Sequence, residues 1–307
     1  MDRELQKRMG TGAPTDYGVL MESVHGLCAR YPAISFNYLG NSILGRGIPL
    51  LSIGTGDRHV LYVGAHHGME GITASLLLRF IAELCDWNER QAERERLSPQ
   101  MYFKAHTLHI VPMLNPDGVE YQQHGVEENN PLCMRAIGMN GGSRNFSRWQ
   151  ANARGVDLNH NYDADFDAYK HLAAREGIES GAPTRFAGEY AESEPEVASL
   201  CNLIRFDEQI CGVITLHTQG EEIFCGRRFD ARTSAIAHRL ARLCGYRLST
   251  AVGLASMSGL TDWCNEIMDI SAFTLECGKG KNPLPPTDAP RIYTTIRRAL
   301  LLFPTLL

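Results

Sequence analysis

The sequence predicts an α/β fold, with a mixed, largely parallel twisted sheet and helices on both of its faces. Short apolar runs of strand length alternate along the chain with longer segments of helical periodicity. No internal repeat, low-complexity tract or linker divides the 307 residues, so we expect a single domain over 1–307. Hydrophobic residues make up 44% and charged residues 21% of the chain, which is ordinary for a globular protein.

The first third of the chain alternates between helices and strands. A helix is expected after Thr15-Asp16 and before Pro32, because its apolar residues recur at helical spacing. A second, amphipathic helix is expected over 71–85. The apolar runs on either side of it are expected as strands at 34–39, 48–54, 59–65 and 108–113.

The remaining chain divides into a polar stretch and a second alternating region. Residues 119–190 are rich in Gly and Asn and weakly periodic, so we expect a loop-rich excursion, with a short helix near 167–176. Ser193 and Glu196, three residues apart, form a capping-box pattern that predicts a helix start at Ser193. The later elements are expected as strands at 211–217 and 271–276, a helix at 231–245 and a terminal helix.

Charge and cysteine content exclude several classes of partner and compartment. The net charge is −5 and the pI about 6.1, so no basic field favours nucleic acid or an anionic membrane. The opening residues contain no apolar run typical of a signal peptide, and the closing RRALLLFPTLL is too short to span a bilayer. Nine cysteines, an odd number without a CxxC pair, favour a reducing environment. A cytoplasmic location is therefore expected.

Polar residues that suit metal chemistry follow the predicted strands. His66-His67, His217 and Glu276 lie at the carboxyl ends of three of them, where open α/β sheets build their sites. Glu70 lies three residues after His67 at the start of a helix, so one turn brings both side chains together. His67, Glu70 and His217 thus form a two-histidine, one-carboxylate set that suits one catalytic Zn²⁺ per chain.

Hydrolysis at such a site needs a base beside the metal. Zinc lowers the pKa of water to about 7, and a carboxylate outside the ligand set can take the proton and pass it to the leaving amine. Glu276 is the candidate for this role. Considered separately, an HxxE pattern is common and more often means two unrelated surface residues, and a histidine that ends a strand is more often a polar residue with ordinary partners. His66 is read as structural or as a supporting neighbour.

Five motifs in order give the chain a resemblance to the zinc carboxypeptidase superfamily, the M14 peptidases. They are HHGME at 66–70, NPDG at 115–118, GVDLNHNYDADF at 155–166, LHTQG at 216–220, and TDWC followed by AFTLECG. WQANARGVDLN, SEPEV and ECGKGKNPLP look like the bacterial branch of γ-D-glutamyl-diaminopimelate peptidases. This resemblance implies zinc-dependent hydrolysis of the γ-D-glutamyl-diaminopimelate bond in murein peptides. It also implies that Asn159 contacts a substrate carboxylate.

The chain departs from the family pattern at its cationic positions. His160 stands where pancreatic-type carboxypeptidases carry an arginine that clamps the terminal carboxylate, and an imidazole is not an equivalent anion ligand. Gln150 occupies the position of the arginine that stabilises the oxyanion. We expect Arg148, or failing that Arg154 or zinc itself, to take over this role.

Two other functions remain open from the sequence. One is an N-acyl amino acid deacylase, as in aspartoacylase-like relatives of the same fold. The other is a sensor that binds murein peptides without cleaving them, a reading supported only by the missing arginines. A small peptide, such as a cell-wall muropeptide, is the expected partner, and the sequence indicates no oligomeric state.

Overall fold

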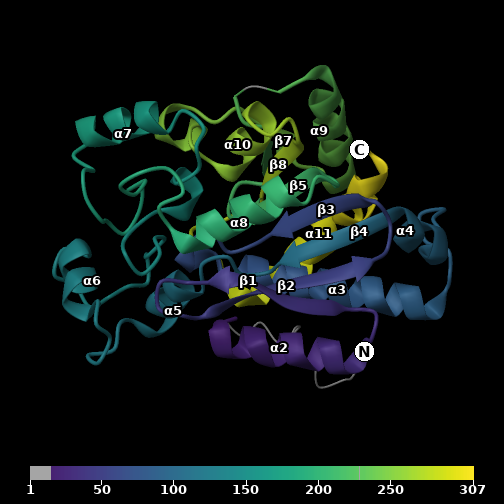
Figure 1. Ribbon diagram of the computed structural model, residues 1–307, viewed down its shortest axis with the longest axis horizontal. Helices are drawn as coiled ribbons and strands as arrows, with labels where there is room; N and C mark the ends of the chain where they lie inside the picture. The colour runs from purple at the N-terminus through teal and green to yellow at the C-terminus, as the bar shows by residue number, and fades with distance from the viewer. Residues whose placement is uncertain (1–14, 228) are drawn as a thin grey trace.

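The computed structural model describes residues 15–227 and 229–307, which form a mixed α/β fold as predicted. Residues 1–14, most of the segment from which the absence of a signal peptide was predicted, lie outside this part. One sheet has the strand order β1-β2-β4-β3-β5-β8-β6-β7 (Figure 1). The strands are β1 Ser35–Asn41, β2 Gly47–Gly54, β3 Arg58–Val63, β4 His106–Val111, β5 Ile210–His217, β6 Glu222–Phe224, β7 Arg247–Leu248 and β8 Ser271–Glu276.

Helices cover both faces of this sheet. The α-helices are α2 Tyr17–Arg30, α3 Ile72–Arg90, α4 Pro99–Ala105, α5 Pro116–His124, α6 Cys133–Met139, α7 Phe166–Arg175, α8 Pro195–Phe206, α9 Ala231–Cys244, α10 Leu260–Glu266 and α11 Ala289–Leu302. In Figure 1, α8 lies on the near face, and α3 and α11 lie behind the sheet. The buried residues divide accordingly, because α8 and α10 belong to one core cluster and α2, α3, α9 and α11 to the other.

The four central strands β4, β3, β5 and β8 run parallel. The outer pairs β1-β2, β2-β4 and β6-β8 are antiparallel, which makes the sheet mixed. Parallel strands buried on both faces read as continuous apolar runs, and the central strands have that pattern. Their carboxyl ends meet at one edge of the sheet, where the polar residues His67, His217 and Glu276 follow or end them.

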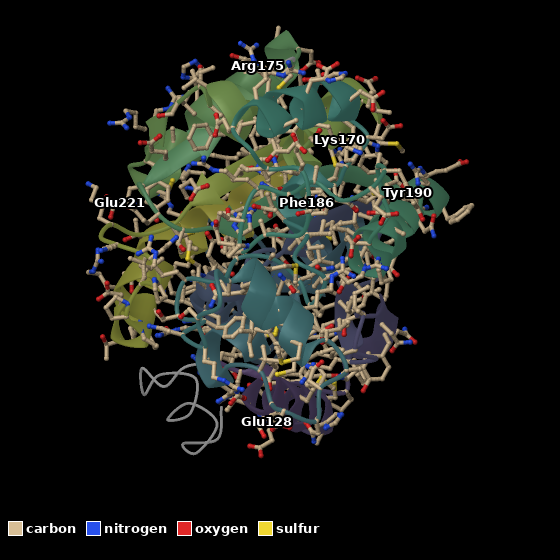
Figure 2. The ribbon with its side chains drawn as sticks, turned by 90° about the vertical axis from the view of Figure 1, so that its left-hand side faces the viewer. Glu128, Lys170, Arg175, Phe186, Tyr190 and Glu221 are labelled. Atoms are coloured by element: carbon tan, nitrogen blue, oxygen red, sulfur yellow. The ribbon has the colours of Figure 1, made fainter. Side chains whose placement is uncertain are left out.

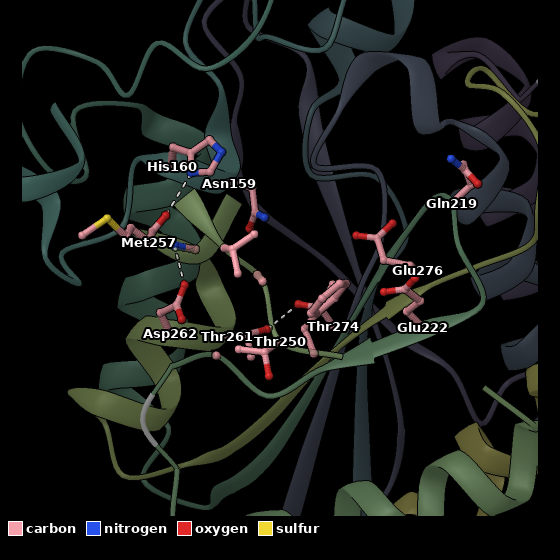
Figure 3. Close-up of a pocket in the computed structure, with 15 residues that line it drawn as sticks. Asn159, His160, Gln219, Glu222, Thr250, Met257, Thr261, Asp262, Thr274 and Glu276 are labelled. Carbon is pink, nitrogen blue, oxygen red and sulfur yellow. Dashed lines mark hydrogen bonds between the residues drawn. The ribbon is translucent and has the colours of Figure 1, made fainter. Parts of the chain in front are cut away.

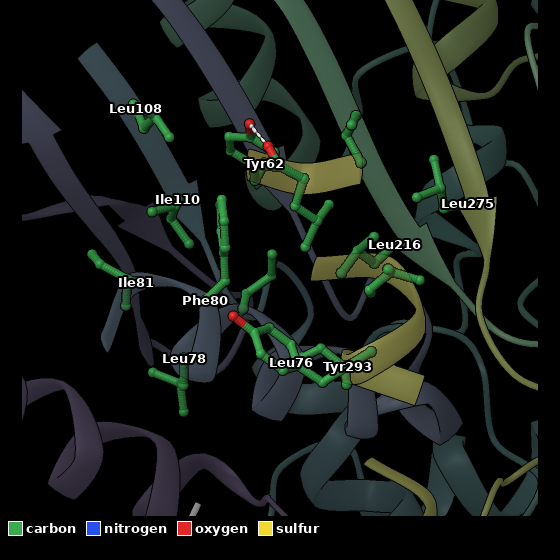
Figure 4. Close-up of a cluster of buried hydrophobic side chains, with 14 of the residues drawn as sticks. Tyr62, Leu76, Leu78, Phe80, Ile81, Leu108, Ile110, Leu216, Leu275 and Tyr293 are labelled. Atoms are coloured by element: carbon green, nitrogen blue, oxygen red, sulfur yellow. Dashed lines mark hydrogen bonds between the residues drawn. The ribbon is translucent and has the colours of Figure 1, made fainter. Parts of the chain in front are cut away.

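The larger core cluster fills the space between the sheet and α3 and α11 (Figure 4). Tyr62, Phe80, Leu216 and Leu275 are all less than about a fiftieth exposed, and the hydroxyl of Tyr62 donates a 2.8 Å hydrogen bond to the carbonyl of Leu300. The buried phenol of Tyr62 therefore has its hydrogen-bond partner, as buried polar groups usually do.

The loop-rich excursion covers one end of the molecule. Figure 2 looks onto it and labels Glu128, Lys170 and Tyr190 on its surface. The helix expected near 167–176 is α7, whereas α5 and α6 were not predicted. The excursion has a small core of its own, which includes Tyr121, Phe146, Trp149 and three buried alanines.

The predicted start of α8 is wrong. The helix begins at Pro195, its N-cap is Glu194, and the cap makes no side-chain hydrogen bond. The hydroxyl of Ser193 instead donates to Glu194 Oε1 at 2.8 Å and accepts from Asn161 Nδ2 at 3.0 Å. Proline is favoured in the first turn of a helix because that turn leaves its N–H groups unpaired. A tertiary contact and Pro195 therefore override the local capping pattern.

The cysteines at all nine positions are free thiols, as predicted, and Cys277 is buried in the core. No described helix is both long and apolar enough to cross a lipid bilayer.

Glu196 gives the fold a testable pH dependence. Its side chain is fully buried and accepts from the Ile43 amide at 3.3 Å, and burial raises its pKa to about 8. The folded state thus keeps this proton up to about pH 8, whereas the unfolded chain releases it near pH 4.5. The free energy of unfolding is therefore expected to decrease as the pH rises from about 4.5 to about 8, by at most about 1.4 kcal/mol for each pH unit.

We expect Glu196→Gln to remove most of this pH dependence and to stabilise the protein near pH 8. The free energy of unfolding, measured by urea denaturation at several pH values, checks this. Glu93→Gln, at an exposed position, is the matched control and should leave the pH profile unchanged. A variant whose stability falls with pH as steeply as that of the parent would show that Glu196 is ionised in the fold.

Candidate active site

Three metal-binding side chains meet at the carboxyl edge of the parallel strands. His67 directly precedes the short 3-10 turn Gly68–Glu70 that follows β3, Glu70 is the last residue of that turn, and His217 is the last residue of β5. All three are buried, and one ligand atom from each lies within 4.8 Å of the others. The sequence-predicted set is therefore brought together by adjacent parallel strands and one tight turn.

The distances within this cluster suit a shared cation. Glu70 places one carboxylate oxygen 3.2 Å from His67 Nδ1 and the other 3.1 Å from His217 Nδ1. The two Nδ1 atoms are 3.3 Å apart. In a tetrahedral zinc site with bonds of about 2.0–2.1 Å, neighbouring ligand atoms are separated by roughly 3.3 Å. The donor set thus fits zinc in both chemistry and spacing.

The turn that carries His67 and Glu70 is fixed by a close backbone approach. Gly68 donates its N–H to the carbonyl of Gln150 at 2.8 Å, and a Cβ at Gly68 would overlap the carbonyl of Gly118. Gly118 belongs to the NPDG segment that opens α5, where Asn115 accepts its N–H at 2.9 Å. Glycine at position 68 therefore lets the two turns pack against each other.

Electrostatic interactions keep Glu70 ionised, and they favour a proton on His67 that a bound metal ion would displace. Burial by itself would raise the pKa of Glu70, but His67 and His217 outweigh it and lower this pKa to about 2. Burial likewise opposes the charge on His67, whereas Glu70 and Asp157 raise its pKa well above the usual range. A buried carboxylate is thus kept ionised at neutral pH, as a metal ligand must be.

Neighbouring polar groups orient these side chains. Asp157 Oδ1 lies 3.0 Å from His67 Nε2, and Asp157 Oδ2 accepts the Arg185 N–H at 2.9 Å. A carboxylate behind an imidazole fixes its tautomer and leaves the other nitrogen free for a metal. Asn282 donates to Glu70 Oε1 at 3.4 Å. Sequence analysis missed both Asp157 and Asn282 as partners, although Asp157 lies within the conspicuous GVDLN segment.

His66 points into the protein rather than into the cluster. Its Nε2 lies 2.9 Å from the Tyr162 hydroxyl and its Nδ1 lies 3.2 Å from the Thr215 hydroxyl. Burial and the adjacent His217 and His67 lower its pKa well below the usual range, so the ring is neutral. The ring stacks on His217 at a centroid distance of 5.2 Å.

Glu276 lies beside the cluster on the next strand. It ends β8 and pairs in register with His217, the last residue of β5. Burial, followed by the charge of Glu70, raises its pKa to about 8. The carboxylate is therefore poised to exchange a proton near neutral pH, which is the property that a general base and acid requires.

Glu276 opens onto a pocket of about 440 Å³ (Figure 3). Figure 3 shows Glu276, Glu222 and Gln219 on one side of it, and Asn159, His160 and Asp262 on the other. Three threonine hydroxyls line it as well, from Thr250, Thr261 and Thr274. None of its described lining residues is Lys or Arg. The pocket therefore offers acidic and neutral hydrogen-bonding groups rather than a cationic clamp.

The residues predicted to bind substrate separate into two groups. Asn159 and His160 line the pocket. The Nδ1 of His160 lies 3.0 Å from the Met257 carbonyl, its ring stacks on Tyr169, and burial lowers its pKa, so it is a neutral group. Arg148 is exposed and does not line the pocket.

Arg154, the second candidate for oxyanion stabilisation, bonds to residues outside the pocket. Arg154 donates from Nε to Glu194 Oε2 at 3.1 Å and from its guanidinium to the Ser193 carbonyl at 3.0 Å. Gln150 accepts a hydrogen bond from the Thr184 hydroxyl. Neither side chain lines the pocket.

A His-Glu-His cluster and a protonatable carboxylate at the carboxyl edge of a mixed α/β sheet define a metal-dependent hydrolase. The chain belongs to the zinc carboxypeptidase family, peptidase family M14, whose model matches residues 20–295. It is therefore a zinc metallopeptidase.

One curated relative supports the family assignment, and two solved structures share the fold. The γ-D-glutamyl-L-diamino acid endopeptidase 1 of Lysinibacillus sphaericus is 30% identical over 280 residues, which cover 91% of this chain and 69% of the relative. Carboxypeptidase A from Helicoverpa armigera superposes with a TM-score of 0.74 at 17% identity, over 96% of this chain and 74% of that one. Murein-tripeptide amidase MpaA from Escherichia coli O157 gives 0.51 at 22% identity, over 87% and 91%. The two structural likenesses concern the fold.

Proposed function

We propose that this chain is a zinc peptidase that hydrolyses the γ-D-glutamyl-diaminopimelate bond of murein-type peptides. In this proposal, His67, Glu70 and His217 hold the zinc ion, Glu276 is the general base, and 1–307 acts as one catalytic domain. The observation that carries it is the register of β5 and β8, which places a carboxylate with a raised pKa beside the metal cluster and at the mouth of a pocket.

The chain's own residues divide the chemistry between them. Zinc, when bound, polarises the scissile carbonyl and makes water acidic enough to react near neutral pH. Glu276 accepts the proton of the attacking water and delivers it to the leaving amine. Its pKa is raised to about 8 in the metal-free protein, and the charge of a bound cation would lower that pKa and favour the ionised form that accepts the proton. Asp157 holds the ring of His67, so that Nδ1 faces Glu70 and His217.

The pocket supports a diamino acid as the leaving group. Glu222, which also pairs with Arg247, and Asp262, which accepts the N–H groups of Arg227 and Gly259, line it together with the three threonines. Their carboxylate oxygens are proposed to accept from the extra ammonium of diaminopimelate as well. Asn159 and His160 are proposed to hydrogen-bond a substrate carboxylate from the opposite wall, with Arg148 as an exposed third contact for longer substrates. The similarity to an endopeptidase for γ-D-glutamyl-L-diamino acid bonds supports the same substrate class.

A reducing compartment, such as the cytoplasm, is proposed as the place of action. Free cysteines at all nine positions support it, because extracellular proteins of this kind usually pair their thiols. The substrate would then be a released muropeptide.

The test is hydrolysis of L-Ala-γ-D-Glu-meso-diaminopimelate by the zinc-loaded protein, followed by chromatography of the products. Release of diaminopimelate is expected. The same peptide with lysine as the third residue lacks the second carboxylate of diaminopimelate, so the difference in hydrolysis rate measures the contribution of that group. N-acetyl amino acids form the comparison arm. If the protein cleaved N-acetyl amino acids and left the γ-D-glutamyl bond intact, it would be an N-acyl amino acid deacylase and the proposal would be wrong.

Asp157→Asn is expected to weaken zinc binding about 10- to 100-fold without unfolding the protein. The amide cannot hold His67 Nε2–H as strongly as the carboxylate does, so the ring loses its preferred tautomer. Competition with a zinc-selective dye measures the affinity. Asp163→Asn, at an exposed position of the same segment, is the control. If the two variants bound zinc with equal affinity, Asp157 would have no role in orienting the metal ligand His67.

A further inference from the structure

A second group of metal-binding side chains lies at the other end of the parallel strands. His59 is the second residue of β3, His109 lies within β4, and Asp207 directly follows α8. One ligand atom from each lies within 4.8 Å of the others. Nothing in the proposed catalytic chemistry uses these residues.

The sheet and α8 bring them together. His59 and His109 lie on the face of the sheet that α8 covers, because they share the side-chain parity of Leu61 and Val111 in the core cluster beneath that helix. The hydrophobic contacts of α8 end near its last turn, where Asp207 caps the helix. Three polar side chains thus lie at one end of an otherwise apolar interface between α8 and the sheet.

Their spacing is close to that of a metal site. His109 Nε2 lies 3.3 Å from His59 Nδ1 and 3.3 Å from Asp207 Oδ2. These separations match the roughly 3.3 Å between neighbouring ligands of tetrahedral zinc. The third separation, from His59 Nδ1 to Asp207 Oδ2, is 2.6 Å and would have to increase by roughly 0.7 Å to match the other two.

The surroundings provide orientation and access. Ser52, opposite His109 on β2, places its hydroxyl 2.7 Å from His109 Nδ1. With Nδ1–H donating to Ser52, the lone pair of His109 Nε2 faces His59 and Asp207, as in sites where a second hydrogen bond orients the ligand. The side chains of His59, His109 and Asp207 are 16%, 12% and 20% exposed, so an ion and a solvent ligand can enter.

We propose that His59, His109 and Asp207 form a second, non-catalytic binding site for a divalent transition-metal ion. Two imidazoles and one carboxylate favour zinc, cobalt or nickel over magnesium or calcium, which prefer all-oxygen sites. The ion would cross-link β3, β4 and the turn between α8 and β5. From His59 to Val63 the strand alone spans about 13 Å toward the catalytic edge, so this ion lies too far away to share the reaction.

Metal equivalents per chain test the proposal. After dialysis in zinc-buffered solution, elemental analysis should find two equivalents in the parent protein and one in both His109→Gln and Asp207→Asn. His67→Ala should also retain one. Titration of the His67→Ala chain with Co²⁺ should give the strong visible absorption of a tetrahedral site, and His67→Ala/His109→Gln should lose it.

Two further variants sharpen the result. Ser52→Ala should keep all ligands but weaken the second site by about 10- to 100-fold. His25→Gln, an exposed histidine on α2, should change nothing. If His109→Gln does not fold, Asp207→Asn and the zinc-dependent rise in the melting temperature of His67→Ala supply the same comparison.

The proposal is overturned if the parent protein binds one equivalent of zinc and only His67→Ala removes it. His59, His109 and Asp207 would then be a hydrogen-bonded cluster without a metal ion. It is also overturned if a second equivalent survives both His109→Gln and Asp207→Asn. An equivalent that His109→Gln removes and His67→Ala leaves in place upholds this site even if the catalytic assignment fails.

Discussion

Glu276→Gln should reduce turnover of the γ-D-glutamyl peptide by about 10²- to 10⁴-fold, while the protein keeps its catalytic zinc. The amide has nearly the same shape as the carboxylate, so the packing at the end of β8 is preserved. It cannot accept the proton of the attacking water, however, and the reaction loses its base. Steady-state kinetics together with zinc content by elemental analysis measure the two effects separately.

The control for this variant is Glu221→Gln. Glu221 lies close by, since its N–H donates to the Glu276 carbonyl, but its side chain pairs with Lys279 at 2.8 Å and does not line the pocket. Its kcat should stay within a few-fold of the parent's. Equal activity of Glu276→Gln and the parent would exclude Glu276 as the base. A cellular effect that persists in a catalytically dead Glu276→Gln protein would instead favour the sensor reading.

The second large effect is expected at His217. His217→Ala should remove one equivalent of tightly bound zinc and abolish peptidase activity, because only one imidazole and one carboxylate would remain. Treating the parent protein with a chelator should have the same effect, and added zinc should restore activity. Chelation should also lower the melting temperature, since an ion present at 100 times its dissociation constant stabilises the fold by about 2.7 kcal/mol.

His171→Ala supplies the matched control, because this histidine is exposed on α7. It should retain zinc, activity and melting temperature. If His217→Ala kept full zinc content and turnover, the cluster at the end of β3 and β5 would not be the catalytic metal site.

The sequence was most informative where local pattern and tertiary structure agree. Buried parallel strands appear as unbroken apolar runs, so the positions of β3, β5 and β8 could be predicted within a few residues. Because parallel strands end at one edge, the polar residues behind them could be placed together before any coordinates were known. His67, Glu70 and His217 do lie together there.

Other features depend on contacts that no local pattern encodes. The last two strands of the sheet, β6 and β7, are three and two residues long, too short to show periodicity. Helix α8 begins at Pro195 rather than at the apparent capping box at Ser193. The role of Asp157 arises because a loop 90 residues away along the chain folds back onto His67. Arg148, inferred from its nearness in sequence to the motif, lies exposed and outside the pocket.

The pairing of His217 with Glu276 across β5 and β8 has a consequence for how such enzymes diverge. One set of backbone hydrogen bonds fixes the separation between His217 and Glu276, and a shift of the register by a single residue would replace Glu276 by Cys277, which is buried in the core. Asn159 and His160, which are proposed to contact the substrate, come instead from a connection outside the sheet. Insertions and substitutions can therefore remodel specificity on this scaffold while the reacting centre stays at constant dimensions.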